Sequence, residues 1–499
     1  GEREQALAAW RGALSDDPRF ARNYGLAGRL MREAGFYEEA IETYRRGRMN
    51  GALYRSYTAE IIRLERLLGR EETAFREAVQ LLEAGPALDV GDVQLLARIY
   101  RESGLDEELF AIADSAAAAA GGGRFDIARA VLLLEAGRYR EAEDYISGRN
   151  PLADREFYAF IRYLSFAWRD NRDTGFVTFY RKALEEFLDL YPGNAVAPEV
   201  LLVLAESLRE EARLGGDREK LLTRAIGAIG RVREHRWGKL LLERAAILEA
   251  DILLDDLRLP RKAVEAIEGV DFKNAANARR AEEIHMTALV RAGDWEAVER
   301  RAAILETSGD SVKAAIGLYG RGLKSFYRGE YAEAVDLLSS LAESHPWSRY
   351  ANDALETALL LKGALAGDPA PLDCYRKAIA LREAGERGAA SDSLEALVER
   401  YPSSSIVPRA LYERAELDLL SGERERAERG LEKLAESHPL SELAPRALER
   451  LAALERKDDP KRAMRRYETI LERYPDDPFL ERVRRAYLEL RRSNERVEE

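Results

Sequence analysis

The chain has 499 residues, of which 46% are hydrophobic and 34% are charged, so it can form a core and still cover a large surface with charge. A net charge of −12, a pI near 5.3 and the lack of any Lys-rich run argue against a nucleic-acid-binding protein. The longest apolar runs are too short to span a bilayer, and no signal peptide is visible. Good helix formers dominate and strand-like alternation is rare, which predicts an all-α fold.

A glycine followed five residues later by an alanine marks the predicted repeat. It occurs at Gly35 and Ala40, Gly69 and Ala74, Gly137 and Ala142, Gly329 and Ala334, and Gly422 and Ala427. We interpret the glycine as the end of a first helix and the alanine as the point where a second helix packs closely against it. A proline twelve residues after the alanine, such as Pro346 after Ala334, ends the second helix in several copies.

Taken in chain order, the pattern predicts helix pairs with a period of about 34 residues. Gly1 falls on the mid-repeat glycine, so the first repeat is expected to lack its first helix in this sequence. Further repeats are expected to start near residues 21, 55, 90, 123, 161, 198, 244, 279, 315, 371, 408 and 444. We expect three segments: an N-terminal array over 1–154, irregular helical repeats over 155–278, and a C-terminal array over 279–499 with one extra helix near 349–366.

Patterns typical of catalysis or metal binding are missing from the sequence. The four histidines are far apart, and no Cys/His metal spacing, phosphate-binding loop or dinucleotide fingerprint occurs. His345 and His438 each precede a helix-ending proline, and we interpret them as turn residues. Cys374 is the single cysteine, which suits a reducing cytosol and equally an envelope protein that avoids stray thiols. We therefore expect no enzyme, no cofactor and no metal site.

The repeat residues resemble the tetratricopeptide family over nearly the whole chain. This resemblance implies an α-solenoid, a right-handed superhelix of antiparallel helix pairs whose concave groove holds partner proteins. The turns between repeats share one further form, seen in Tyr191-Pro-Gly-Asn-Ala-Val-Ala-Pro198, Tyr401-Pro-Ser-Ser-Ser-Ile-Val-Pro408 and His438-Pro-Leu-Ser-Glu-Leu-Ala-Pro445, and begun in Tyr474-Pro-Asp-Asp-Pro478. They look like the turns of bacterial envelope proteins of the outer-membrane assembly lipoprotein and Tol–Pal coordinator type. Similar turns occur in the helical scaffold of soluble lytic transglycosylases.

The resemblance implies a non-catalytic protein-interaction scaffold in the assembly or maintenance of the bacterial envelope. We expect a protein or peptide partner, no nucleic acid, no transmembrane segment in this chain, and a periplasmic or outer-membrane-associated location, with a lipid anchor upstream of Gly1 as one arrangement. Two alternatives stay open: a scaffold arm of an envelope enzyme such as a lytic transglycosylase, and a cytosolic adaptor. A lipobox before Gly1 would favour the scaffold, and a hydrolytic domain after Glu499 would favour the enzyme arm.

Arginine pairs occupy positions nine and twelve of three consecutive first helices: Arg29 and Arg32, Arg63 and Arg66, and Arg98 and Arg101. Residues three apart share one side of a helix, and the family resemblance places these positions toward the concave groove. The pattern stops at Leu132 and Glu135, and Arg169 and Arg172 resume it.

Stacked repeats would align the six arginines into a ladder, with Gly25, Ala59 and Ala128 leaving room for a ligand. We predict that residues 21–105 bind an acidic peptide segment or, as the alternative, an anionic envelope polymer. The competing interpretation is a solvated face on which Glu33, Glu60, Glu65 and Glu102 neutralise the arginines.

Aromatic residues are concentrated between positions 157 and 191. Helical spacing places Phe157, Phe160, Ile161, Leu164 and Trp168 on one face, which we predict to be core. Tyr158, Tyr163 and Phe166 point elsewhere. Either neighbouring helices bury these three residues too, or they form an exposed docking patch, for which Phe166 is our candidate partner contact.

Overall fold

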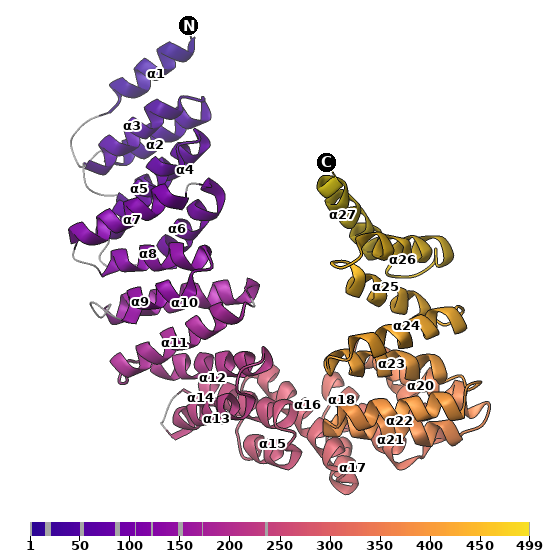
Figure 1. Ribbon diagram of the computed structural model, residues 1–499. Helices are drawn as coiled ribbons and strands as arrows, with labels where there is room; N and C mark the ends of the chain where they lie inside the picture. The colour runs from indigo at the N-terminus through magenta and orange to yellow at the C-terminus, as the bar shows by residue number, and fades with distance from the viewer. Residues whose placement is uncertain are drawn as a thin grey trace. The chain divides into compact units, whose positions relative to one another are not determined.

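The computed structural model describes residues 2–14, 21–49, 54–84, 90–104, 106–120, 123–147, 153–171, 173–234 and 238–498. Within these ranges the regular structure is entirely helical, and no β-strand occurs. Successive helices pack against each other as antiparallel pairs (Figure 1). The predicted all-α solenoid of helix pairs is therefore confirmed. The chain divides into two compact units, Gly1–Ala245 and Ala246–Glu499. Their boundary lies inside the segment predicted to be irregular, and the three predicted segments themselves stay a prediction.

The first unit alternates first and second helices of successive repeats. Its helices are α1 (Glu2–Gly12), α2 (Ala21–Glu33), α3 (Tyr37–Met49), α4 (Tyr54–Leu67), α5 (Glu71–Ala84), α6 (Val90–Ser103), α7 (Asp106–Ala120), α8 (Arg124–Glu135), α9 (Tyr139–Ser147), α10 (Asp154–Asp170), α11 (Thr174–Leu190), α12 (Ala197–Arg213) and α13 (Arg218–Glu234). The unit boundary falls within α14 (Lys239–Asp251). The first helices α2, α4, α6, α8 and α12 begin within one residue of the predicted starts, whereas α10 begins earlier, at Asp154.

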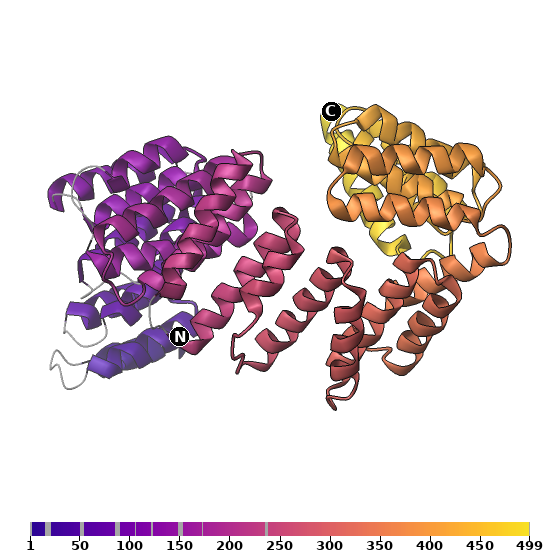
Figure 2. The same ribbon diagram turned by 90° about the horizontal axis from the view of Figure 1, so that it is seen from below.

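The second unit opens with a short π-helix, η2 (Ile252–Asp256). Its α-helices are α15 (Pro260–Ile267), α16 (Ala275–Ala292), α17 (Trp295–Glu306), α18 (Ser311–Arg328), α19 (Tyr331–Ser344), α20 (Ala351–Leu365), α21 (Ala370–Ala384), α22 (Arg387–Arg400), α23 (Val407–Leu420), α24 (Arg424–Ser437), α25 (Leu443–Glu455), α26 (Pro460–Arg473) and α27 (Leu480–Glu498). From α21 onward the helices pack consecutively, and they are drawn in orange to yellow in Figure 2.

The glycine-to-alanine motif forms the turn inside each repeat, as predicted. All five glycines have positive φ, between 72° and 82°, a conformation that side chains with a Cβ rarely adopt. At Gly35, for example, the glycine amide donates to the Arg32 carbonyl at 3.0 Å and the next amide donates to Met31 at 2.8 Å, which is the Schellman pattern of a helix end. The five alanines that follow are completely buried, so a larger side chain would push the second helix away.

The turns between repeats share one hydrogen-bond pattern that explains their sequence. In Tyr401-Pro-Ser-Ser, the Ser404 amide donates to the Tyr401 carbonyl at 3.0 Å, and the Ser404 hydroxyl accepts from the Ile406 amide at 3.4 Å. Asn194, Ser441 and Asp477 accept from the backbone in the same way in their own turns. A short side-chain acceptor at this position therefore starts the next first helix.

Candidate partner-binding groove

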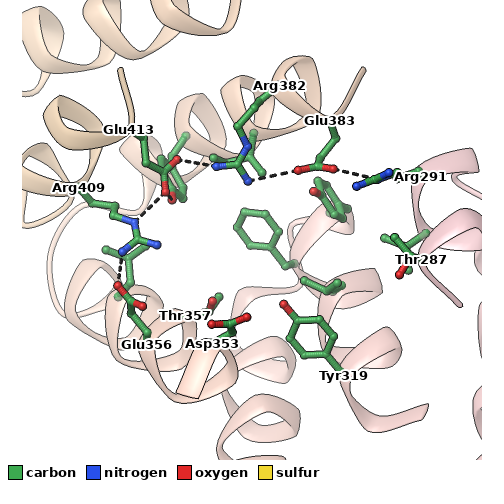
Figure 3. A pocket seen from close by; sticks show the side chains of 17 residues that line it. Thr287, Arg291, Tyr319, Asp353, Glu356, Thr357, Arg382, Glu383, Arg409 and Glu413 are labelled. Atoms are coloured by element: carbon green, nitrogen blue, oxygen red, sulfur yellow. Dashed lines mark hydrogen bonds and ion pairs between the residues drawn. The ribbon is translucent and has the colours of Figure 1, made fainter. Parts of the chain in front are cut away.

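A cavity of about 420 Å³ lies on the side of the second unit where its first helices meet (Figure 3). Five helices line it: α16, α18, α20, α21 and α23. Each contributes residues three or four positions apart, which share one face of a helix. On α18 these residues are Tyr319, Leu323, Phe326 and Tyr327. Second helices contribute no lining residue to this cavity.

The walls of the cavity combine an apolar lining with aromatic rings. Leu323, Leu360 and Ile379 supply aliphatic surface, and Phe326 and Tyr375 are buried beside it. Tyr319 stacks on Tyr350 with ring centroids 4.7 Å apart and planes at 22°. A preformed cavity with a few polar groups over an apolar floor is the usual form of a binding site.

Ion pairs connect the helices around the cavity in one continuous chain (Figure 3). Arg291 Nε of α16 lies 2.9 Å from Glu383 Oε2 of α21, and Glu383 Oε1 lies 3.3 Å from Arg382 Nη2. Arg382 Nη1 reaches Glu413 Oε2 of α23 at 3.1 Å, and Glu413 Oε1 accepts from Arg409 Nε at 2.7 Å. Arg409 also pairs with Glu356 of α20, which closes the chain between four helices.

Two polar groups that line the cavity stay outside this chain. The Asp353 carboxylate forms no ion pair within residues 246–498, and the Tyr319 hydroxyl forms no hydrogen bond there. Burial and the nearby Asp353 charge raise the pKa of Tyr319 to about 12, so its hydroxyl is protonated near neutral pH. The Tyr375 hydroxyl, by contrast, donates to Glu413 at 2.8 Å.

Positions nine and twelve of three first helices line this cavity, whereas those of α23, Glu416 and Leu419, do not. The lining positions are Thr287 and Val290 on α16, Leu323 and Phe326 on α18, and Ile379 and Arg382 on α21. The register rule from the resemblance therefore holds on these three helices of the second unit. Position alone could have identified these six residues.

In the first unit, the three arginines at position twelve each pair with the next first helix. Arg32 Nη1 of α2 lies 2.8 Å from Glu60 Oε2 of α4, and Arg101 Nε of α6 lies 3.2 Å from Glu135 Oε2 of α8. Arg66 of α4 pairs in the same way with Glu102 of α6. These arginines connect neighbouring repeats, as the competing interpretation expected for Glu60 and Glu102.

The three arginines at position nine are exposed. Arg63 pairs with Glu60 on its own helix at 2.8 Å, whereas Arg29 and Arg98 form no ion pair with any residue that the structure describes. The expectation that Gly25 and Ala128 leave room for a ligand is wrong: a Cβ on Gly25 would meet the Tyr57 ring at 3.2 Å, and Ala128 is completely buried. The role of the six arginines in partner binding stays a prediction.

The aromatic segment is mostly core. Phe157, Phe160, Ile161 and Leu164 are buried as predicted, whereas Trp168 is only partly buried. Tyr163 is buried too, and its hydroxyl donates to Glu135 at 2.7 Å. Phe166 differs, because its side chain is 39% exposed and the Arg169 guanidinium carbon lies 5.3 Å from its ring centroid. The resumed arginine pair thus brings Arg169 to Phe166, while Arg172 lies outside the described residues.

Elsewhere in the described ranges, no group of three or more His, Cys, Asp or Glu side chains is placed to hold a metal ion. No described helix combines the length and the apolar character needed to cross a membrane. His345 and His438 cap the ends of α19 and α24, in agreement with their interpretation as turn residues.

The fold and this groove define a solenoid of antiparallel helix pairs, a class typical of scaffolds for protein–protein interactions. Residues 375–404, from within α21 to the turn after α22, match the family model of the tetratricopeptide repeat.

The chain is also similar to several solved structures. With the human IFIT1 dimer bound to m7Gppp-AAAA it shares 14% identity over 85% of this chain and 95% of that chain, at a TM-score of 0.26. With yeast Tom70 the identity is 13% over 96% of both chains, at a TM-score of 0.23. The Cut9–Hcn1 hetero-tetramer of the APC/C gives 13% identity over 87% of this chain and 96% of that chain, at a TM-score of 0.21. No curated protein sequence matches the chain.

Proposed function

We propose that this protein is a non-catalytic scaffold that holds a segment of a partner protein in the groove of its second unit. The observation that carries the proposal is the 420 Å³ cavity lined by four first helices and the extra helix α20. All of its charged side chains except Asp353 are already fixed by mutual ion pairs, so a partner meets an organised surface and binding costs little additional order. Its aromatic and aliphatic lining supplies the buried contact area on which protein interfaces depend.

Site-specific crosslinking tests this function. A photoreactive benzoylphenylalanine at Thr357, which lines the cavity, should capture a partner protein in the native cells. The same residue at Asp336 is the matched control, because Asp336 is an exposed acid of the second helix α19 outside the cavity. A partner captured at both positions, or at neither, would contradict the proposal. Thr357→Arg should fill the cavity and prevent capture by a probe at Thr287, which also lines it, while far-UV circular dichroism stays unchanged.

In the first unit, the exposed arginines Arg29, Arg63 and Arg98 support a second contact, with an acidic segment of a partner. Arg29 and Arg98 have no ion pair among the described residues, so both guanidinium groups are available to carboxylates. The triple variant Arg29→Glu, Arg63→Glu and Arg98→Glu should weaken partner binding and abolish its salt dependence. The control reverses the three position-twelve arginines, which should instead loosen the packing between α2, α4, α6 and α8. Unchanged affinity and salt dependence in the first variant would exclude the ladder as a binding site.

The proposed setting is the bacterial envelope, and the Tyr-Pro and His-Pro turns are its support. Cell fractionation followed by immunoblotting of the native protein tests it. Recovery with the outer membrane or periplasm would support an envelope scaffold. Recovery in the cytosol alone would reject that setting and favour the cytosolic adaptor. Co-purification with a peptidoglycan-cleaving activity would favour the enzyme-arm alternative.

A further inference from the structure

Each arginine that lines the groove already pairs with carboxylates, whereas one of the lining carboxylates has no cationic partner in the described part of the chain. Arg291, Arg382 and Arg409 each contact two carboxylates; for Arg291 these are Asp255 at 2.9 Å and Glu383 at 2.9 Å. Four carboxylates line the cavity against these three guanidinium groups. The fourth, Asp353, has no cationic partner within residues 246–498. The cavity therefore carries surplus negative charge, and that charge is located at Asp353.

Aromatic surface lies next to this uncompensated charge. Tyr319 is close enough to Asp353 for the carboxylate to raise the pKa of the phenol, and Figure 3 shows both side chains at the same edge of the cavity. Stacking on Tyr350 holds the Tyr319 ring in place. Phe326 and Tyr327 line the cavity about two turns further along α18. The electron-rich faces of such rings attract cations, and the attraction grows when water is excluded.

From this combination we infer that the cavity binds a basic side chain, an arginine or a lysine, presented by the partner segment. The inference rests on the proposed scaffold function and specifies the chemistry of its ligand. The cationic head pairs with Asp353 beside Tyr319, and the aliphatic stem lies against Leu323 and Leu360. A cavity of about 420 Å³ falls within the range of about 300–1,000 Å³ that is usual for small-molecule pockets, which is large enough for one side chain.

Other occupants fit the charges less well. An acidic side chain would meet arginines that already hold two carboxylates each, and it would lie near the unpaired Asp353. A purely apolar side chain would remove water from Asp353 without providing a counter-charge, which is unfavourable for a carboxylate. A cation satisfies the open carboxylate and leaves the existing ion-pair chain intact.

Ligand-detected NMR on the full chain tests this inference with three small probes. They are the N-acetyl methylamides of arginine, of citrulline, which has the shape of arginine without its charge, and of aspartate. The arginine probe should bind, and the citrulline probe should bind about tenfold more weakly or not at all. Asp353→Asn and Tyr319→Leu should each weaken the arginine probe about tenfold. The matched control Asp336→Asn removes one exposed acid from α19 and should change nothing.

Equal binding of the arginine and citrulline probes overturns the inference, and so does a preference for aspartate or an Asp353→Asn variant that binds like the wild type. Failure of the scaffold function has a different signature. Partner capture at Thr357 without binding of the arginine probe keeps the scaffold function and removes the basic side chain as its ligand. Binding of the arginine probe without partner capture keeps the cation site and removes the scaffold function.

Discussion

The Asp418 carboxylate connects three helices in the second unit, and its removal should loosen all three together. Asp418 lies at the end of α23 and is only 2% exposed. Ser391 Oγ of α22 donates to Asp418 Oδ1 at 2.5 Å. Arg414 Nε of α23 and Arg426 Nε of α24 lie 3.6 Å and 3.7 Å from Asp418 Oδ2. In Asp418→Ala, the two arginines and the serine lose this shared partner.

The magnitude follows from the burial of these groups. Removing one member of a buried ion pair costs about 3–5 kcal/mol, because the other charge stays in the interior without compensation. Arg426 keeps 27% of its side-chain surface exposed and still pairs with Asp392 and Glu395, so we expect the lower end, about 3 kcal/mol. Asp418→Asn keeps the oxygen that accepts from Ser391 and loses only the charge, and should therefore cost less.

Hydrogen exchange followed by mass spectrometry is the suitable assay, because each repeat of a solenoid contacts mainly its neighbours and local opening is measured segment by segment. A loss of about 3 kcal/mol accelerates exchange in α22, α23 and α24 by about a hundredfold. Exchange in the first unit should not change. The control is Glu425→Ala on α24, whose side chain is 93% exposed and lies 3.9 Å from Arg429. If Asp418→Ala opens α22 and α24 no more than this control does, Asp418 does not hold the three helices together.

Three further predictions concern packing, pH and the aromatic segment. Gly322→Ala should destabilise α18 by about 1–3 kcal/mol, because the new methyl group would lie 2.5 Å from Leu338 of α19. Gly227→Ala, at an open position of α13, should instead stabilise its helix, and hydrogen exchange measures both effects. Burial raises the pKa of Glu206, so the folded state binds the proton of this carboxyl more tightly than the unfolded chain does, and its contribution to stability falls as pH rises. Glu206→Gln should therefore stabilise α12 at about pH 8, and thermal melts should show this gain disappear toward about pH 4. Phe166→Ser should lower the free energy of unfolding by about 1–2 kcal/mol and weaken partner binding. Phe160→Ser, at a fully buried site on the same helix, should lower it by about 3–5 kcal/mol. Equal losses of stability in the two variants would assign Phe166 to the core.

The repeat could be predicted from the sequence because its signals act through the local backbone. A glycine such as Gly35 takes a positive φ that few other residues accept, and Ala40 is buried at the contact between two helices. The positive φ and the close helix contact each involve residues that are near in sequence, so the same residue types recur in every repeat. The pattern can therefore be recognised in a single sequence. The same holds for the turn that starts at Tyr401, where Ser404 must supply a short acceptor.

One further turn of this kind was missed, at His345-Pro-Trp-Ser. The Ser348 amide donates to the His345 carbonyl at 2.9 Å, and the Ser348 hydroxyl accepts from the Tyr350 amide at 3.2 Å, as in the turns that were recognised. This turn starts α20, which packs on α19 in the place of a new first helix. The signal that could have identified it was the serine three residues after the histidine, and Ser441 stands in the same place after His438.

The groove could not be predicted to the same extent, because its contacts join distant parts of the sequence. Arg382 and Glu413 are 31 residues apart, and Arg291 and Glu383 are 92 apart. In a chain with 78 basic and 90 acidic residues, countless such pairs are conceivable. Only the stacking of repeats decides which pairs form. The register rule identifies positions that face the groove, but it does not tell whether an arginine there is open to a ligand or already paired.

This distinction changes what the arginines of the two units can recognise. Arg382 occupies position twelve of its helix, as Arg32, Arg66 and Arg101 do, and all four are bound to glutamates of other helices. Where position twelve carries arginine, the side chain joins neighbouring helices, because a planar guanidinium can contact carboxylates from two directions at once. These arginines are not open to a ligand, so the charged groups that can recognise one come from position nine and from α20, the extra helix without a repeat partner. In the first unit position nine carries exposed arginines, which suit an acidic segment. In the second unit it carries Leu323 and Ile379, and α20 adds Asp353, so the same architecture there favours an aliphatic stem that ends in a positive charge.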